Sequence, residues 1–502
     1  MMNKMQSAPP VKAFRSLFNT RYTLLLLLFF YSLFSFQCKK DLTTSSSSAK
    51  LSFSANLLFF DTVFATGTTG SSVRAFVVHN NNSEAVVVSS IRLGGNYSSF
   101  KINVDGVSGT NFNNIKIPAK DSIYVFAQVN VNPLNANNPL VIDDSLQFTT
   151  NGNVQYVYML AFGWNAYYYV PNVHPKNGPA YYQLPSGNNT WTNDKPHVIF
   201  GYLFIPPGST LNIQAGAGVY LHDSATIYVD SGATINVTGS FASPVTFQGD
   251  RLEPDYKYLP GQWNEILLAP GSINNNISWA VIQNGTTGVQ ADTVYNSNPT
   301  LKMDHTIIKS MSGYGLFGAG AVIKADDCVI ADCQYGCLYL WIGGDYQFNQ
   351  CTFADYWGVD NSYGQRISPL LYLNNYYQSY AGQTIERPIR NAFFGNCIIY
   401  GALAEELKLD SLNTNTDPMN YYFKNCIIKT QHAYFPGHHN NDSIYLNLDP
   451  LFTNPAADNY EVNSGSPAIG NANSSIASQP QYHMDLAGNP RNPPYTIGAY
   501  QQ

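Results

Sequence analysis

Two adjacent carboxylates, Asp326 and Asp327, are the first candidates for acid and base chemistry in this chain. Hydrolysis of a glycosidic bond requires two or three carboxylates in one cleft, of which one acts as the acid and another as the base or nucleophile. Asp327, however, occupies a position that is polar in nearly every copy of the repeat described below. Such a position is typical of a solvated bend, and this is where we expect Asp327 to lie.

Basic side chains offer a second chemistry, the removal of the proton α to a uronate carboxylate. This lyase step requires a base such as Arg or Lys, and a Ca²⁺ ion held by acids to stabilise the enolate. Arg387 and Arg390 flank a Pro-Ile dipeptide, and because adjacent strand residues alternate between faces, we expect them to point apart. The catalytic residues therefore stay unknown, with Asp326, Asp327 and Arg387 as candidates. Ca²⁺ is expected only if the chain is a lyase, and no other cofactor is indicated.

Four tyrosines could bind a sugar rather than transform it, because a tyrosine ring offers a flat apolar face and a hydroxyl group. They are Tyr372, Tyr376, Tyr377 and Tyr380. They fall in an insertion between repeats, and insertions on a solenoid often gather on one face and form its binding surface. The alternative is that these tyrosines simply cover the flank of the solenoid.

Four of the seven cysteines recur at one position of the repeat. They are Cys328, Cys351, Cys397 and Cys426. A cysteine at such a position serves as a small hydrophobe stacked in a core column. A metal cluster of Cys328, Cys333 and Cys337 is not predicted, because the three lack a paired Cys-x-x-Cys and a histidine at ligand spacing. In an exported protein, Cys333 and Cys337 form the one pair to test for a disulfide.

A four-residue pattern returns along the second half of the chain, with a usually polar first residue, a small second residue and apolar residues after it. Its copies begin at Trp279, His305, Asp327, Gln350, Asn396 and Asn425. Their third residues are spaced by 26, 22, 23, 46 and 29 residues, which indicates a period of about 23 with one copy missed near Leu373. A repeat of about 20 to 30 residues that is built from strands, and that lacks a leucine consensus, predicts a parallel β-helix. The second and fourth residues of each copy then point inward.

The residues before this solenoid predict a separate β-sandwich. Short strands alternate in polarity, as at residues 123–131, and Asn151-Gly152 indicates a hairpin because a tight turn needs positive φ at its central residues. About seven such strands favour an immunoglobulin-like sandwich. The predicted all-β organisation is a sandwich at 51–165, a linker at 166–196, a right-handed parallel β-helix at 197–465 and its C-terminal closing segment at 466–502.

The N-terminus predicts export. Four basic residues within 1–21 precede an apolar run at 22–36, as in a signal peptide. The run is too short for a transmembrane helix, which needs about 20 apolar residues, and Cys38 follows it. We expect a lipoprotein signal peptide at 1–37, lipid attachment at Cys38 and a Ser-rich tether at 38–50. The alternative is an ordinary secretory signal in which Cys38 is incidental.

The solenoid resembles the pectate-lyase-like right-handed parallel β-helix proteins that occur as surface lipoproteins of Gram-negative bacteria. The resemblance rests on Ile205-Pro206-Pro207-Gly208-Ser209-Thr210-Leu211, on Pro260-Gly261-Gln262-Trp263, on Ser466-Pro467-Ala468-Ile469, and on Asp485-Leu486-Ala487-Gly488-Asn489-Pro490-Arg491 with Ile497-Gly498-Ala499-Tyr500. The group includes polysaccharide lyases and hydrolases, and also proteins without known activity, so the fold alone does not define a reaction. Polygalacturonase-type members combine an aspartate pair with Gly-His-Gly and Arg-x-Lys. Neither motif is present, and Gly437-His438-His439 is the nearest approach.

These observations favour a non-catalytic binding or structural protein of the outer membrane or cell surface. Its expected partners are the membrane, through the lipid anchor, and an extracellular polysaccharide. A lyase or glycoside hydrolase acting on uronate-containing glycans is the alternative. The net charge of −6 disfavours nucleic acid, because phosphate-backbone binding requires a basic surface.

Overall fold

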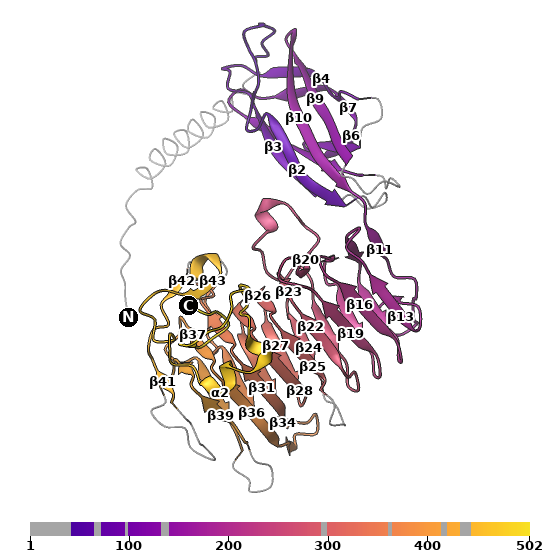
Figure 1. Cartoon of the computed structure of the whole chain (residues 1–502). Helices are drawn as coiled ribbons and strands as arrows, with labels where there is room; N and C mark the ends of the chain where they lie inside the picture. Colours follow the sequence, from indigo (N-terminus) through magenta and orange to yellow (C-terminus); the bar gives the residue numbers. More distant parts are fainter. Residues whose placement is uncertain are drawn as a thin grey trace, which may run out of the picture. The chain divides into compact units, whose positions relative to one another are not determined.

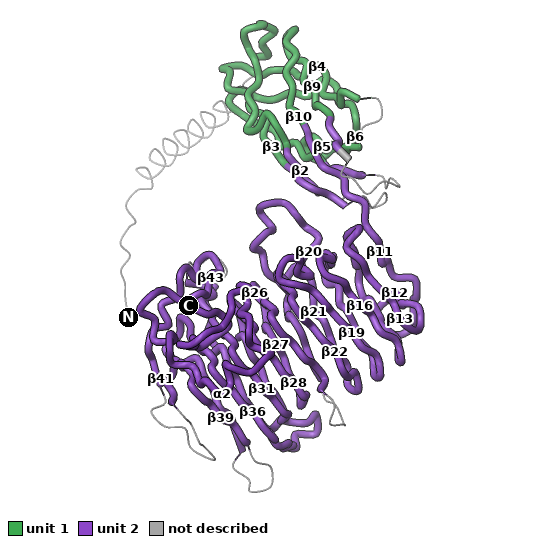
Figure 2. Tube along the Cα trace, in the orientation of Figure 1, with its two compact units in different colours: residues 1–58, 75–127, 144–158 green, residues 59–74, 128–143, 159–502 purple. Residues whose placement is uncertain are grey.

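The structure, a computed structural model, describes residues 42–64, 72–95, 99–131, 140–292, 299–359, 364–412, 419–431 and 443–502 (Figure 1). The predicted signal peptide and Cys38 lie outside these ranges. Within them, no helix is long and apolar enough to cross a membrane. The chain divides into two compact units, which are residues 1–58, 75–127 and 144–158, and residues 59–74, 128–143 and 159–502 (Figure 2).

The N-terminal part contains two five-stranded sheets, as expected for a sandwich. One has the order β1 (Ser52–Phe53), β3 (Ser72–His79), β8 (Ser122–Val129), β5 (Phe100–Val104), β6 (Val107–Gly109), and the other β2 (Leu57–Phe64), β10 (Asn153–Trp164), β9 (Leu140–Thr150), β4 (Val86–Leu93), β7 (Asn111–Ile117). Ile123 and Val125 of β8 are buried, whereas Tyr124 and Phe126 are exposed, as the alternation predicts. The predicted hairpin is confirmed, because residues 151 and 152 join β9 to β10 with φ of 51° and 78°.

The remainder is a parallel β-helix built from three long sheets, which confirms the predicted solenoid. The first solenoid sheet contains β11 (Tyr167–Tyr169), β14 (His197–Ile199), β17 (Gly218–Leu221), β20 (Val245–Gly249), β23 (Ala280–Gln283), β26 (Ile307–Met311), β29 (Val329–Cys333), β32 (Thr352–Asp355), β37 (Ile398–Gly401), β40 (Ile427–Ile428) and β41 (Tyr445–Leu446). The second contains β12 (Tyr181–Gln183), β15 (Tyr202–Ile205), β18 (Thr226–Val229), β21 (Glu265–Leu268), β24 (Val289–Ala291), β27 (Tyr314–Ala319), β30 (Gly336–Trp341), β33 (Leu371–Asn374) and β38 (Leu407–Asp410). The third contains β13 (Asn188–Trp191), β16 (Thr210–Gln214), β19 (Thr234–Thr238), β22 (Asn275–Ser278), β25 (Leu301–Asp304), β28 (Val322–Asp326), β31 (Gly344–Asn349), β36 (Ile389–Gly395) and β39 (Tyr422–Lys424).

Each turn of the solenoid stacks its apolar side chains on those of the next turn. In the second sheet, Leu203 pairs with Ile227, and Ile227 pairs with Ile266; all three are fully buried. Small residues form the matching column beside the first sheet, where Cys351 and Cys397 are buried free thiols. Their inward orientation agrees with the sequence prediction, because both thiols belong to the continuous apolar interior of the solenoid.

The recurring polar residue lies at the bend between the third and first sheets. There the backbone adopts the left-handed conformation, with φ of 49° at Asp327, 51° at Gln350 and 54° at Asn396. Asparagine and aspartate are among the few non-glycine residues that adopt this conformation readily. The bend is confirmed, but its predicted solvation is wrong, because these three side chains are completely buried.

The C-terminal residues explain that burial. They contain β42 (Phe452–Asn454), β43 (Asn459–Val462), a single helical turn α2 (Ser474–Ala477) and two 3₁₀ turns, η2 (Pro455–Ala457) and η3 (Pro480–Tyr482), and appear yellow in Figure 1. Leu486, Ile497 and Ala499 form a second buried cluster with Val329 and Ile398, whose side chains point outward from the first sheet. The closing segment therefore covers the outer face of the last turns.

Two predictions about the solenoid's extent are wrong. Residues 166–196 are not a linker, since β11, β12 and β13 pair in parallel with β14, β15 and β16 and form the first turn. The interval of 46 residues does not hide a turn either, because Phe353 pairs directly with Ile399. Its extra length lies in a loop before β33 and in the antiparallel hairpin β34 (Tyr376–Gln378) and β35 (Thr384–Glu386).

Candidate functional site: the aromatic face of the second solenoid sheet

The predicted catalytic carboxylates are both enclosed by the closing segment. One oxygen of Asp326 accepts hydrogen bonds from the Tyr482 hydroxyl (2.7 Å) and the Asn349 amide (3.0 Å). Asp327 accepts a charge-assisted hydrogen bond of 2.5 Å from Arg491, and both side chains of this ion pair are 0% exposed. Burial raises the pKa of Asp326, and it raises the pKa of Asp327 to about 7 despite the Arg491 charge. In this arrangement the pair attaches the closing segment to the solenoid.

The third candidate lies elsewhere. Arg387 lies just before the first residue of β36, whereas Asp326 is the last residue of β28. Both strands belong to the third sheet, so the two residues lie at opposite ends of its parallel strands. Arg387 contributes its backbone N–H to the Asn375 carbonyl oxygen (2.8 Å), at the base of the inserted hairpin. The structure therefore does not bring the three catalytic candidates into one cleft, and Gly437-His438-His439 lies outside the described residues.

Sequence reasoning missed a second buried charged group, at the bend between the first and second sheets. Arg366 binds both oxygens of Glu406 at 2.6 and 2.7 Å and lies 3.2 Å from Asp355, and the three side chains are at most 1% exposed. Burial, opposed by the Arg366 charge, holds the pKa of Asp355 well above its ordinary value. The sequence contains no motif that predicts this charged group, because its three members come from separate segments of the chain.

The four predicted sugar-binding tyrosines do not share one environment. Tyr372 lies on β33 in the outward column of the second sheet. Tyr376 donates a hydrogen bond of 3.1 Å to Asp410, and Tyr377 contacts the edge of Trp341 with ring centroids 6.0 Å apart. Tyr380 is fully exposed. Three of the four thus meet residues of the second sheet, whereas the Tyr380 side chain is exposed to solvent.

The outward column that contains Tyr372 is largely aromatic. From the first turn to the ninth it reads Gln183, Phe204, Tyr228, Leu267, Gln290, Phe317, Tyr339, Tyr372 and Lys408. The rings of Phe317 and Tyr339 stack at 5.2 Å with planes 14° apart, and those of Tyr339 and Tyr372 at 4.6 Å and 13°. Because stacked rings cover one another's faces, these members present their edges and hydroxyls to solvent. Burial raises the pKa of Tyr339 to about 12, so its hydroxyl stays protonated and able to donate.

Trp341 differs from the column in its orientation. Its ring is inclined by 64° to Phe317 and by 67° to Tyr377, so its contacts with both are of the edge type. The Trp341 side chain is partly exposed, and a sugar's C–H groups can pack on an exposed aromatic ring. We call Phe317, Tyr339, Trp341, Tyr372, Tyr376 and Tyr377 the aromatic face.

Polar groups border the aromatic face. Asp410 accepts hydrogen bonds from the hydroxyls of Tyr372 (2.7 Å) and Tyr376 (3.1 Å), which fixes both rings. The Lys408 ammonium lies 5.5 Å from the centre of the Tyr372 ring, within cation–π range. The face and its border therefore combine apolar edges, fixed hydroxyls, a carboxylate and an ammonium within four consecutive turns.

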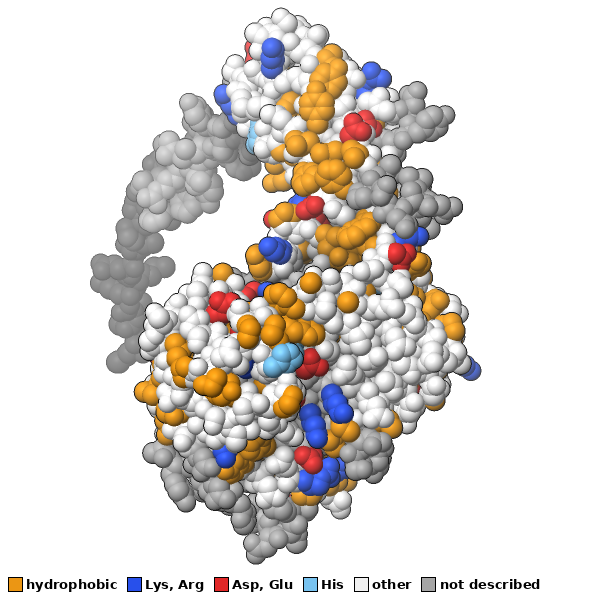
Figure 3. All heavy atoms as spheres, viewed as in Figure 1, with side chains coloured by type: hydrophobic (Ala, Val, Ile, Leu, Met, Phe, Trp, Pro, Cys, Tyr) orange, Lys and Arg blue, Asp and Glu red, His pale blue; other side chains and the backbone are white. Residues whose placement is uncertain are grey.

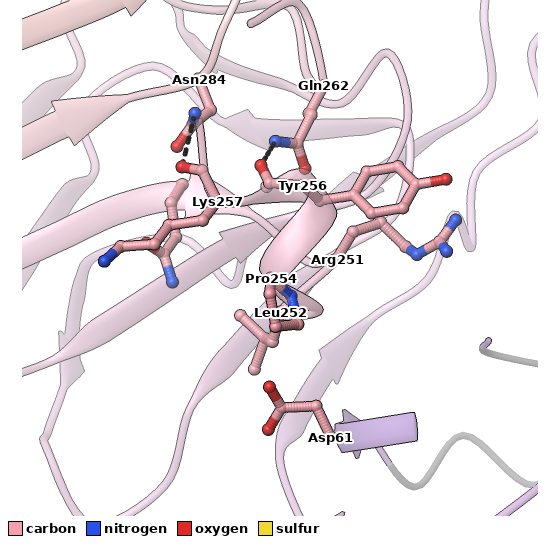
Figure 4. A pocket seen from close by; sticks show the side chains of 10 residues that line it. Asp61, Arg251, Leu252, Pro254, Tyr256, Lys257, Gln262 and Asn284 are labelled. Atoms are coloured by element: carbon pink, nitrogen blue, oxygen red, sulfur yellow. Dashed lines mark hydrogen bonds between the residues drawn. The ribbon is translucent and has the colours of Figure 1, made fainter. Parts of the chain in front are cut away.

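A pocket of about 350 Å³ lies apart from this face, bordered in part by the loop after β20 (Figure 4). The Gln262 amide donates to the Tyr256 carbonyl oxygen at 2.7 Å. The Arg251 guanidinium lies 4.0 Å from the centre of the Tyr256 ring and 2.7 Å from a Glu253 oxygen. These contacts hold the loop together, and they engage Arg251, one of the two cationic residues of the pocket wall.

A periodic search for aromatic residues could have found the face. Phe317 and Tyr339 are 22 residues apart, which is one period of the repeat, and Tyr339 and Tyr372 are separated by 33 residues because of the loop before β33. Trp341 follows Tyr339 by two places on the same strand, so both point outward. The sequence prediction concentrated on the insertion and missed this alignment.

No protein-family model and no curated protein matches the chain. Among solved structures, similarity extends to the VesB protease of Vibrio cholerae (12% identity, 23% of this chain, 32% of that chain, TM-score 0.17) and to the CooA pilin subunit of enterotoxigenic Escherichia coli (10%, 23%, 97%, 0.18). A family 123 glycoside hydrolase of Clostridium perfringens is a third example (12%, 23%, 27%, 0.17). Less than a third of the first of these chains is matched. TM-scores this low support no inference about fold or function.

Proposed function

We propose that this protein is a non-catalytic glycan-binding β-helix of the bacterial surface, and that the aromatic face of the second solenoid sheet holds the glycan. The observation that carries the proposal is the position of Trp341, whose ring is turned out of the stacked column. A pyranose ring packs its C–H groups on such an aromatic face, while neighbouring phenol hydroxyls and carboxylates take up its hydroxyl groups.

The regular rise of the solenoid supports an extended ligand. Adjacent parallel strands are roughly 4.8 Å apart, so Phe317, Tyr339 and Tyr372 lie in a straight row across three turns. A polysaccharide chain can run along such a row and meet similar groups at each step. Figure 3 shows one face of the molecule, on which Lys, Arg, Asp and Glu side chains are in the minority.

The rival function, a lyase or glycoside hydrolase acting on uronates, has less support. Acid catalysis requires a carboxyl group that reaches the substrate. Asp327 is completely buried beneath the closing segment, and Arg387 lies at the other edge of the third sheet. This proposal includes two expectations from the sequence. They are that the chain belongs to the pectate-lyase-like group and that it is attached to the membrane through Cys38.

Titration of the purified protein with a panel of soluble polysaccharides tests the proposal. Trp341→Ala should weaken binding of the active polysaccharide roughly two- to twelvefold, because a stacking contact on one aromatic ring contributes roughly 0.5–1.5 kcal/mol. The matched control is Tyr422→Ala, which removes a similarly half-buried ring stacked on Phe393 of the third sheet. Equal affinities of the wild type and Trp341→Ala, or an equal loss in both variants, would contradict the proposed site.

A further inference from the structure

Two carboxylates lie beside the column at the two turns where its aromatic series is interrupted, and a third lies on the turn before them. Leu267 and Gln290 are its two adjacent members between Tyr228 and Phe317. Glu265 precedes Leu267 by two positions on β21, and Asp292 follows Gln290 by two positions. Because side chains two positions apart share a face, both carboxylates point to the same side of the sheet as the column, one on each flank.

The third carboxylate, Asp230, follows Tyr228 by two positions and therefore lies on the same flank as Asp292. The acids act on their neighbours through space. Burial and then the Asp292 charge raise the pKa of Glu265, and burial followed by the charges of Asp230 and Asp292 raises the pKa of Tyr228. The three groups therefore share one electrostatic environment around the interrupted part of the column.

Neighbouring side chains offset this negative charge only weakly. Asp292 accepts a hydrogen bond of 3.0 Å from Gln290, and Glu265 one of 3.3 Å from Asn264; both donors are neutral. Among the described residues, none of the ion pairs involves Asp230, Glu265 or Asp292. At the far end of the column, Lys408 and Asp410 balance each other in formal charge.

We infer that the glycan bound along this column carries amino groups rather than carboxylates. The inference rests on the proposed function and adds the charge class of the ligand. An ammonium group on a sugar would approach Asp230 and Asp292 on one flank of the column, or Glu265 on the other, from the solvent side, and each contact pairs opposite charges. A uronate would bring a like charge to the same place at every sugar residue.

Three hexasaccharides test the inference by titration calorimetry with the full mature protein. They are a glucosamine oligomer, its fully N-acetylated form and a galacturonic acid oligomer. At low salt the glucosamine oligomer should bind at least fivefold more tightly than the N-acetylated form, and the galacturonic acid oligomer more weakly than either. The preference should shrink as salt rises to about 0.5 M, because exposed charges are screened beyond a few ångströms.

A double variant, Glu265→Gln with Asp292→Asn, isolates the carboxylates without changing side-chain size. It should lose the preference for the glucosamine oligomer and keep the affinity for the N-acetylated form. Asp345→Asn, on the third sheet, is the matched control and should keep the preference. The inference is wrong if the galacturonic acid oligomer binds most tightly, or if the preference survives in the double variant.

The same titrations separate this inference from the proposed function. If an oligomer binds and Trp341→Ala abolishes its binding while no preference for amino groups exists, the aromatic site stands and only the charge class is wrong. If Trp341→Ala changes the affinity of no oligomer that binds, the proposed site itself is wrong, and the inference is overturned with it.

Discussion

Cys351 illustrates how a single position is constrained inside the solenoid. Its thiol is completely buried and donates to the Asn349 carbonyl oxygen at 3.2 Å, and burial holds its pKa well above the ordinary value for a thiol. Cys328 and Cys397 lie in the same column on the adjacent turns, and both act on the Cys351 thiol. A site of this kind accepts small neutral groups and excludes charge.

We therefore expect Cys351→Asp to lower the free energy of unfolding by more than about 3 kcal/mol, because it buries a charge without a partner. Cys351→Ala, which only removes a sulfur atom, should cost about 1 kcal/mol. Urea titrations monitored by circular dichroism measure both values.

Gln350→Asp, at the neighbouring bend, should also lower the free energy of unfolding, because Gln350 is buried and its amide donates to the Thr496 carbonyl oxygen (3.4 Å). Wild-type stability of Cys351→Asp would contradict the inward orientation.

The buried carboxyl group of Glu265 makes the stability of the fold depend on pH. Burial, and then the Asp292 charge, raises its pKa from 4.5 to about 7. Between these values the folded protein keeps a proton that the unfolded chain has lost, so stability is highest below the window and falls as the pH rises through it. Glu265→Gln should reduce the fall in Tm between pH 5 and pH 8, as measured by calorimetry. A pH profile of Tm that is unaltered in Glu265→Gln would contradict the assignment.

At the scale of elements, the closing segment completes the solenoid. It covers an outward column of the first sheet that would otherwise expose Val329 and Ile398, and it brings Arg491 to the buried carboxylate of Asp327. The second solenoid sheet is left free of this cover, and the inserted hairpin adds tyrosines to it. The two faces therefore differ in role because different insertions and termini pack on them.

Arg491→Ala should detach part of this cover. Removing one member of a buried ion pair leaves the other charge uncompensated and costs about 3–5 kcal/mol. Lys309→Ala removes a partly exposed ion pair with Asp458, which should cost less than about 1 kcal/mol. Thermal melts give the two values, and binding of a hydrophobic dye should rise only in Arg491→Ala. Equal melts for the two variants would show that the buried pair does not hold the segment.

At the scale of the whole molecule, the sequence predicts a protein tethered outside the cytoplasm. If Cys38 is the attachment residue, a fatty-acid analogue fed to expressing cells should label the wild type and spare Cys38→Ala. The position of Cys38 directly after the apolar run of the signal peptide is the reason for this expectation. Equal labelling of both proteins would favour the alternative of an ordinary secretory signal.

We also expect no turnover of uronate polysaccharides, with or without Ca²⁺. The described carboxylates that resemble a catalytic pair, Asp326 and Asp327, hold the closing segment, and Arg387 lies far along the strand direction from them. Release of unsaturated ends, read by ultraviolet absorbance, together with reducing-sugar release, checks this expectation. Turnover that disappears in Asp326→Asn or Arg387→Ala would replace the binding function with an enzymatic one.

The sequence by itself determined the all-β class, the hairpin at residues 151–152, the repeat, and the inward position of the cysteines. These features depend on local rules, namely alternation along a strand, positive φ at a bend and stacking of like residues at a fixed period. It also indicated the region of the tyrosines, because Tyr372, Tyr376 and Tyr377 are close in sequence.

The tertiary structure alone decided which surfaces stay open. Asp327 looks solvated at its bend, and it is buried only because residues more than 150 positions later pack over it. Trp341, Glu265 and Asp292 have no common sequence signature, and they meet one column because three turns of different length stack in register. Long-range packing and insertion length are not encoded in any short window of the chain, and these two factors define the candidate site.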